Sequence, residues 1–129
     1  VRRWKEASSY VGKDVKEVMV ELSVEGKKQV VDIGDLVKSA CTMVVGKVGA
    51  AIKSIVATAD PEYQPILRNN IILSGGGSLI DGIADAIAND IADIGDVTVT
   101  CVDDPIEKVA TGAMALAQDM PDEQYTAIN

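Results

Sequence analysis

The residues best suited to chemistry lie in the stretch NNIILSGGGSLIDGI, residues 69–83. An apolar segment ends at Ser74, and the glycines Gly75 to Gly77 separate it from Ser78 and an apolar-periodic run. Glycine has no Cβ, so it tolerates positive φ and lets a ligand approach the backbone closely. Backbone N–H groups at the start of a helix attract anions. This pattern therefore predicts a nucleotide site, although a tight turn that binds no ligand would have the same sequence.

The residues after the glycines exclude two familiar phosphate-binding motifs. A Walker loop ends in Gly-Lys-Ser/Thr, whereas this loop continues with Ser78 and Leu79. The dinucleotide fingerprint needs a third glycine where Ile80 stands. Asp81 and Asp85 fall in the first turns of the expected helix with no basic residue beside them; they suit the helix dipole but would repel a polyphosphate. We therefore expect the loop to contact a neutral base and sugar, or the inner phosphate only.

A cationic cluster stands at the start of the chain. Arg2, Arg3, Lys5 and Glu6 lie on a helical pattern, which an ordinary solvated helix face would also show. The functional alternative is that Lys5 donates to ribose hydroxyls and Glu6 accepts from them. The sequence alone leaves both interpretations open.

The segment VVDIGDLV, residues 30–37, resembles the Asp-x-Gly phosphate loops of some ATPases. Those loops continue with small and hydroxyl residues, whereas Leu36 and Val37 follow here. We interpret the segment as the end of a strand, followed by a helix that Asp32 or Asp35 can cap.

Hydrophobic periodicity predicts an α/β protein. In the first half, residues 15–33 alternate as a β-hairpin with one buried face and a turn at 25–28, and a long helix follows over 36–58. The apolar stripe of this helix comprises Leu36, Val37, Ala40, Cys41, Val44, Val45, Val48, Ile52, Ile55 and Val56. Gly46 and Gly49 interrupt the helix and would allow another element to approach closely.

The second half has the order expected of a crossover unit with parallel strands. Its expected elements are a strand at 70–74, the glycine loop, a helix at about 79–92, a strand at 97–102 and a helix at about 107–118. We expect two domain portions: a small lobe over residues 1–68, and part of a larger lobe over residues 69–129. Because the chain begins with Val1 on a running helical pattern, we expect it to be part of a longer polypeptide.

Composition narrows the classes of function. The chain has 129 residues and a net charge of −8, which argues against a nucleic-acid-binding face and against adhesion to anionic lipid. We see no apolar run of membrane-spanning length, so we expect no membrane insertion. There is no His and no Cys-x-x-Cys pattern, so we expect no metal site. Cys41 and Cys101 are expected to be reduced core residues of a cytoplasmic protein.

Three segments resemble one family. Residues 69–83 resemble the adenosine motif of the actin, Hsp70 and sugar kinase superfamily. That motif consists of an apolar strand, a Gly-Gly-Gly/Thr-Ser/Thr loop and a helix. The actin-family helix that carries Arg-x-x-Lys-Glu resembles RRWKEASSYVG, and the last strand and helix of bacterial actins resemble TCVDDP and ATGAMALA. Within that group, residues 60–84 and 97–105 look closest to the magnetosome-associated bacterial actins, and the MreB family is next nearest.

The resemblance implies part of the actin-like ATPase fold, which is ribonuclease H-like: a hairpin and helix subdomain plus a β-loop-α-β-α portion of the larger subdomain. It implies ATP or ADP as the ligand. The residues that it implies at the nucleotide are Arg2, Lys5 and Glu6 for the adenosine and ribose, Gly75, Gly76 and Gly77 under the nucleotide, Ser78 and Ile80 beside the purine, and Lys108 near the adenine. Mg²⁺ is expected to be held by residues outside this chain.

The resemblance further implies a cytoskeletal protein of the cytoplasm that polymerises with itself, organises magnetosome chains, contacts magnetosome-associated proteins and couples ATP hydrolysis to filament dynamics. We expect the complete protein to be an ATPase. This chain contains no expected catalytic residue and should not hydrolyse ATP by itself. Two alternatives remain: a sugar or acetate kinase of the same superfamily, and an interaction domain that binds no nucleotide.

Overall fold

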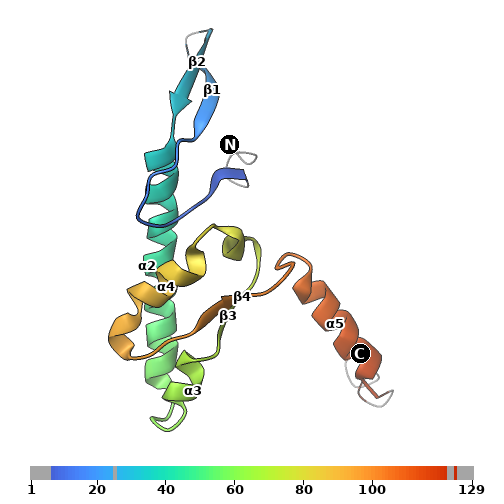
Figure 1. Ribbon diagram of the computed structural model, residues 1–129. Coiled ribbons are helices and arrows are strands. Elements are labelled where there is room, and N and C mark those ends of the chain that lie inside the picture. Colours follow the sequence, from blue (N-terminus) through green and yellow to red (C-terminus); the bar gives the residue numbers. More distant parts are fainter. Residues whose placement is uncertain (1–6, 25, 122–123, 125–129) are drawn as a thin grey trace.

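The computed structural model describes residues 7–24, 26–121 and 124. Within them the elements follow one another along the chain as shown in Figure 1. They are β1 (Met19–Val24), β2 (Lys27–Asp32), α2 (Gly34–Thr58), α3 (Gln64–Arg68), β3 (Ile71–Leu73), the 3₁₀ helix η1 (Gly76–Leu79), α4 (Ile83–Asp90), the 3₁₀ helix η2 (Ala92–Ile94), β4 (Val99–Cys101) and α5 (Lys108–Asp119). The predicted mixture of helices and strands is confirmed.

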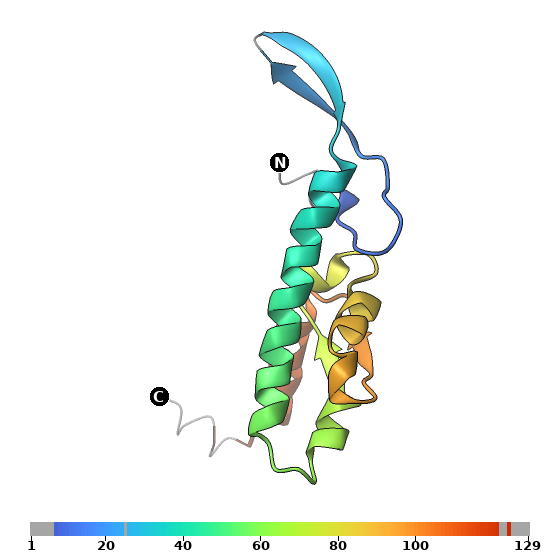
Figure 2. The ribbon, with the colours of Figure 1, turned by 90° about the vertical axis from the view of Figure 1, so that its left-hand side faces the viewer.

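The long helix α2 runs along the molecule, with the hairpin beyond its first turn and the second half beside it (Figure 2). One carboxylate oxygen of Asp32 accepts the N–H groups of Gly34 at 2.9 Å and of Val18 at 2.8 Å. The N-cap residue itself is Ile33, and Asp35 lies in the first turn. Asp32 thus satisfies one of the N–H groups that every helix start leaves unpaired. The interpretation of residues 30–37 as a strand end and helix start is confirmed.

The hairpin forms as predicted, with β1 antiparallel to β2 and Val20 opposite Val31. The predicted buried face exists only at the base of the hairpin, where Val18 and Val20 pack with Tyr10. Strand β2 is exposed along its whole length, and the hairpin projects beyond the N-terminal end of α2 (Figure 1). A fully buried face was therefore the wrong expectation, because no element in the described part of the chain lies over the outer part of the hairpin.

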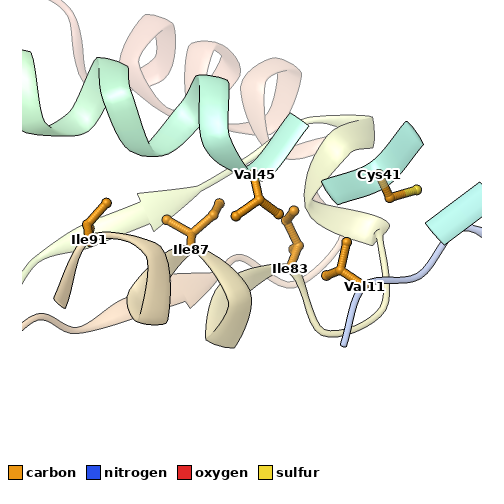
Figure 3. Close-up of a cluster of buried hydrophobic side chains, with 6 residues drawn as sticks. All are labelled: Val11, Cys41, Val45, Ile83, Ile87 and Ile91. Carbon is orange, nitrogen blue, oxygen red and sulfur yellow. The ribbon is translucent and has the colours of Figure 1, made fainter. Parts of the chain in front are cut away.

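The main core forms where α4 packs across α2. Ile87 and Ile91 are 1% and 0% exposed, and Figure 3 shows them with Ile83 and Val45 between the two helices. The predicted close approach is confirmed at Gly49, where an added Cβ would lie 3.2 Å from Ile91 Cγ2. The same prediction is wrong for Gly46, because no atom of residues 7–24, 26–121 or 124 lies within 4 Å of a Cβ added there.

Strands β3 and β4 pair in parallel, with Ile71 opposite Val99, as the predicted crossover unit requires. The helix predicted to start at residue 79 instead starts at Ile83. Gly82 precedes it with a φ of +77°, a left-handed conformation that a continuous helix cannot contain. The glycines lead first into η1, so Asp81 lies between η1 and α4 and outside the helix. The short helix α3 was not predicted.

Several predicted core positions are exposed. On α2, Leu36 is 71% and Ile55 is 65% exposed, and Val44 is also exposed, so only one side of the predicted stripe is packed. Helix α5 forms as predicted but buries none of its residues. Of the two free cysteines, Cys41 is buried as expected and Cys101 is exposed, which corrects its assignment to the core.

Helix α2 also corrects the expectation about membrane-spanning length. Its 25 residues and a mean hydropathy of 1.5 make it long and apolar enough to cross a membrane, by length and composition only. Core helices meet the same criterion, and α2 packs Cys41, Val45 and Val56 away from solvent. The expectation that the chain does not insert into a membrane therefore remains a prediction.

Candidate functional site

The glycine loop leaves β3 through Gly75, whose φ of +86° and ψ of 174° favour glycine. Its N–H donates to the carbonyl oxygen of Pro105 at 3.0 Å, and the Ser74 hydroxyl donates to the same oxygen at 3.3 Å. Pro105 lies on the segment between β4 and α5. The loop is thereby fixed between the ends of two parallel strands and the approach to α5.

Hydrogen bonds within the loop fold the glycines into η1. The carbonyl oxygen of Gly75 accepts both the N–H of Ser78 at 3.0 Å and its hydroxyl at 2.8 Å. The N–H of Ile80 donates to the carbonyl oxygen of Gly77 at 3.3 Å. The Ser78 hydroxyl thus holds the turn closed, a role that sequence reasoning did not assign to it.

The space over the three glycines is open. A Cβ added at Gly75, Gly76 or Gly77 would meet no heavy atom of the described residues within 4 Å. By contrast, a Cβ at the nearby Gly82 would lie 2.8 Å from the carbonyl oxygen of Val11. The loop therefore presents bare backbone to its surroundings, which is the geometry that close approach of a flat ligand requires.

The charge beside the loop differs from the sequence-based expectation. Asp81 was predicted to have no basic neighbour, but its carboxylate forms an ion pair with Lys16 Nζ. The hydrogen bond and the positive charge of Lys16 lower the pKa of Asp81. Lys16 also lies 5.4 Å from the centre of the Tyr10 ring. Sequence reasoning missed Lys16 and Tyr10, since no local pattern relates Lys16 to a residue 65 positions away.

The predicted site residues Arg2, Lys5 and Glu6 lie outside the described residues. The chain that follows them lies against the end of the glycine loop, because Asp81 N–H donates to the Ser9 carbonyl at 3.1 Å. The N–H of Val11 donates back to the Asp81 carbonyl at 2.8 Å. The contacts that the three residues make with a ligand stay a prediction.

Lys108 is the first residue of α5 and is exposed. Its N–H donates to the Asp104 carbonyl at 3.2 Å, in a turn where Asp104 has a φ of +48°. Pro105 in that turn accepts the hydrogen bond from the Gly75 N–H. The start of α5 therefore lies a few residues after the point where the chain meets the glycine loop. The predicted contact of Lys108 with an adenine stays a prediction. In the part of the chain that the structure describes, no three His, Cys, Asp or Glu residues form a group that could hold a metal ion.

Comparison with known proteins identifies relatives for nearly the whole chain. It is 33% identical over 121 residues to the actin-like protein MamK of Paramagnetospirillum magneticum, covering 94% of this chain and 35% of that protein. It is 32% identical over 121 residues to MamK of Magnetospirillum gryphiswaldense, covering 94% of this chain and 34% of that protein. The chain therefore spans about a third of the length of the curated relatives it matches.

Solved structures of MamK share the fold. A MamK double helical filament superposes with a TM-score of 0.87 at 34% identity, covering 92% of this chain and 37% of that one. A non-polymerising MamK mutant bound to AMPPNP gives a TM-score of 0.81 at 33% identity, covering 91% of this chain and 36% of that one. The predicted resemblance to bacterial actins and the predicted actin-like fold are thereby confirmed. Since the MreB/Mbl protein family matches residues 6–125, the chain belongs to that family.

Proposed function

We propose that the complete protein is an actin-like, filament-forming protein and that this chain supplies the adenosine side of its nucleotide site. The open backbone at residues 75–77 is the observation that carries the proposal. Membership of the MreB/Mbl family supports it, as do the related MamK structures, one a filament and one bound to AMPPNP. A nucleotide would lie against the glycines because no side chain of the described residues occupies that space.

The residues around the loop fit an adenine nucleotide chemically. Ser78 and Ile80 would flank the purine, and Lys108 would approach the adenine from the start of α5. Arg2, Lys5 and Glu6 would contact the adenosine and ribose.

Hydrolysis belongs to the complete protein in this proposal. Phosphoryl transfer needs an aligned water molecule and a metal ion on the outer phosphates. The described residues contain no metal-binding group, so Mg²⁺ would be held by residues outside this chain together with the nucleotide phosphates. The role of this chain is to hold the nucleotide, and no catalytic residue is assigned to it.

The filament would be built from copies of the complete protein in a head-to-tail arrangement, because heterologous contacts that do not close into a ring generate open helical assemblies. Organisation of magnetosome chains in the cytoplasm, with magnetosome-associated proteins as partners, is the finer proposal, and the two MamK relatives support it. A net charge of −8 does not favour nucleic acid as a partner.

The test compares Gly76→Val with Gly46→Val in the complete protein. Both added side chains start in open space in this structure, so both variants should fold. Calorimetry with AMPPNP and Mg²⁺ should show binding to the wild type and to Gly46→Val, and an affinity reduced about tenfold or more, equivalent to about 1.4 kcal/mol, for Gly76→Val. Sedimentation with ATP and Mg²⁺ should show wild-type polymer and its loss in Gly76→Val.

Two results would contradict the proposal. One is undiminished AMPPNP binding by Gly76→Val, which would place the nucleotide elsewhere. The other is a wild type that binds no adenine nucleotide, as the interaction-domain alternative expects. Phosphorylation of a small acceptor without any sedimentable polymer would instead favour the kinase alternative.

A further inference from the structure

Residues 9–18, called the strap from here on, connect the end of the glycine loop to the base of the β1–β2 hairpin. We propose that the strap, through Tyr10 and Lys16, couples occupation of the glycine loop to the orientation of the hairpin. This inference rests on the proposed nucleotide site at the loop. The strap makes three consecutive junctions, with the loop, with the start of α2 and with the hairpin base.

The first junction joins the strap to the end of the glycine loop. Tyr10 and Asp81 form a parallel bridge, held by the N–H of Asp81 on the Ser9 carbonyl and the N–H of Val11 on the Asp81 carbonyl. Lys16 adds a side-chain ion pair to the same aspartate. Asp81 follows Ile80, whose N–H is bonded to Gly77. A displacement of the glycines is therefore transmitted directly to the strap.

The second junction joins the strap to the start of α2 through the Tyr10 hydroxyl. Tyr10 is only 2% exposed. Its hydroxyl accepts the N–H of Lys16 at 2.8 Å and donates to the carbonyl oxygen of Gly34 at 3.1 Å. A Cβ on Gly34 would come closer than 3.0 Å to the Lys16 carbonyl oxygen, so strap and helix are in direct contact. Well-packed contacts of this kind transmit displacement because interiors have low compressibility.

The third junction joins the strap to the hairpin base. The N–H of Ile33 donates to the Val18 carbonyl at 2.9 Å, and Asp32 accepts the N–H of Val18. Val18 and Val20 pack with Tyr10 in one buried cluster. Strand β2 is exposed throughout, so within the described residues the packing that orients the hairpin lies at its base. The strap therefore contacts the part of the hairpin that sets its orientation.

The junctions together form a continuous path of hydrogen bonds, one ion pair and buried packing. Coupling along this path requires that the nucleotide bind two arrangements of the strap and hairpin with different affinity. Tyr10 and Lys16 are positioning residues in this scheme, because neither is proposed to touch the nucleotide. Removing the Tyr10 hydroxyl or the Lys16 charge should leave the glycines in place and weaken the link to the hairpin.

The experiment is hydrogen–deuterium exchange of the complete protein with and without AMPPNP and Mg²⁺, read at the amides of β1 and β2. Coupling free energies between sites typically correspond to factors of about 5 to 150, so nucleotide should change hairpin exchange about fivefold or more in the wild type. Tyr10→Phe and Lys16→Met should bind AMPPNP within about threefold of the wild type, which is below that coupling range, and should show a weaker hairpin response.

Lys28→Met is the matched control. It removes the Lys28–Glu21 ion pair within the hairpin, 2.6 Å long, without touching the strap, and should keep the response. Lys16 is mostly exposed, so Lys16→Met tests the inference even if Tyr10→Phe fails to fold. Nucleotide binding without any wild-type hairpin response, or an unchanged response in Lys16→Met, would overturn the inference and leave the proposed site standing. Absence of nucleotide binding would overturn both.

Discussion

Alanine substitutions at Gly34 and Gly46 should change the stability of α2 in opposite directions, although both residues lie on the same helix. Gly46 is exposed in the helix interior, and a Cβ there meets no atom within 4 Å. Alanine at that position should stabilise the helix by about 0.8–1 kcal/mol, because glycine loses more backbone entropy when it is held in a helix. Nothing in the structure opposes this gain.

Gly34 is buried, and its added Cβ would overlap the backbone carbonyl of Lys16. Backbone cannot rotate aside as a side chain can, so the strap must move. Overpacking of this kind costs about 1–3 kcal/mol. The movement also strains the hydrogen bond from the Tyr10 hydroxyl to the Gly34 carbonyl, and a buried polar group left unpaired costs about 1–3 kcal/mol. We expect Gly34→Ala to destabilise α2 by about 2–6 kcal/mol in all.

Native-state hydrogen exchange of the complete protein measures this difference locally, since it reports the free energy of opening for individual segments. Amides of α2 should exchange faster in Gly34→Ala and more slowly in Gly46→Ala than in the wild type. Equal or greater protection of α2 in Gly34→Ala would refute the reasoning, because it would show that the strap does not lie against the start of the helix. Gly46→Ala controls for helix propensity.

Two further predictions concern Asp32 and the cysteines. Hydrogen bonds from the N–H groups of Gly34 and Val18 lower the pKa of Asp32. The stabilisation that these bonds provide is therefore complete above the ordinary pKa of about 3.9 and is lost as pH falls through the lowered pKa of the folded state. Thermal melts of wild type and Asp32→Asn should differ at neutral pH and converge in acid, whereas a constant difference would contradict this. In the native chain a thiol reagent should modify Cys101 quickly and Cys41 only on opening, so Cys101→Ser should abolish the fast phase, and equal rates at both thiols would contradict the structure.

The elements that sequence reasoning predicted well are those whose pattern is local. The alternation of β1 and β2, the strands on either side of α4 and the position of α5 depend on residues near one another in the chain. The start of α4 was misplaced by four residues, because its apolar spacing begins at Leu79 while Gly82 adopts a left-handed conformation. Val11 approaches Gly82 closely, and that contact comes from a distant part of the chain.

Burial was harder to predict than secondary structure. Periodicity shows that a face is apolar and does not show what covers it. Leu36 and Ile55 were expected on the apolar stripe of α2, and in this chain they are exposed. The apolar residues Val109, Met114 and Leu116 of α5 are exposed as well. Extensive exposed apolar surfaces of this kind mark sites of interaction with other protein surfaces. The proposed filament, and the remaining two thirds of a protein as long as its MamK relatives, are both consistent with such surfaces.

The ion pair between Lys16 and Asp81 also changes what the glycine loop can hold. From the sequence, the ligand of the loop was expected to be a neutral base, a sugar or an inner phosphate, because no basic residue stands beside Asp81 and Asp85. Because Lys16 pairs with Asp81, this expectation no longer holds for Asp81 and rests on Asp85. Both partners are largely exposed, so the pair is weak in water and can rearrange when a charged ligand binds. The charge of Asp81 is therefore partly compensated by a residue 65 positions away, and the glycine motif taken alone overstated the limit on what the loop can hold.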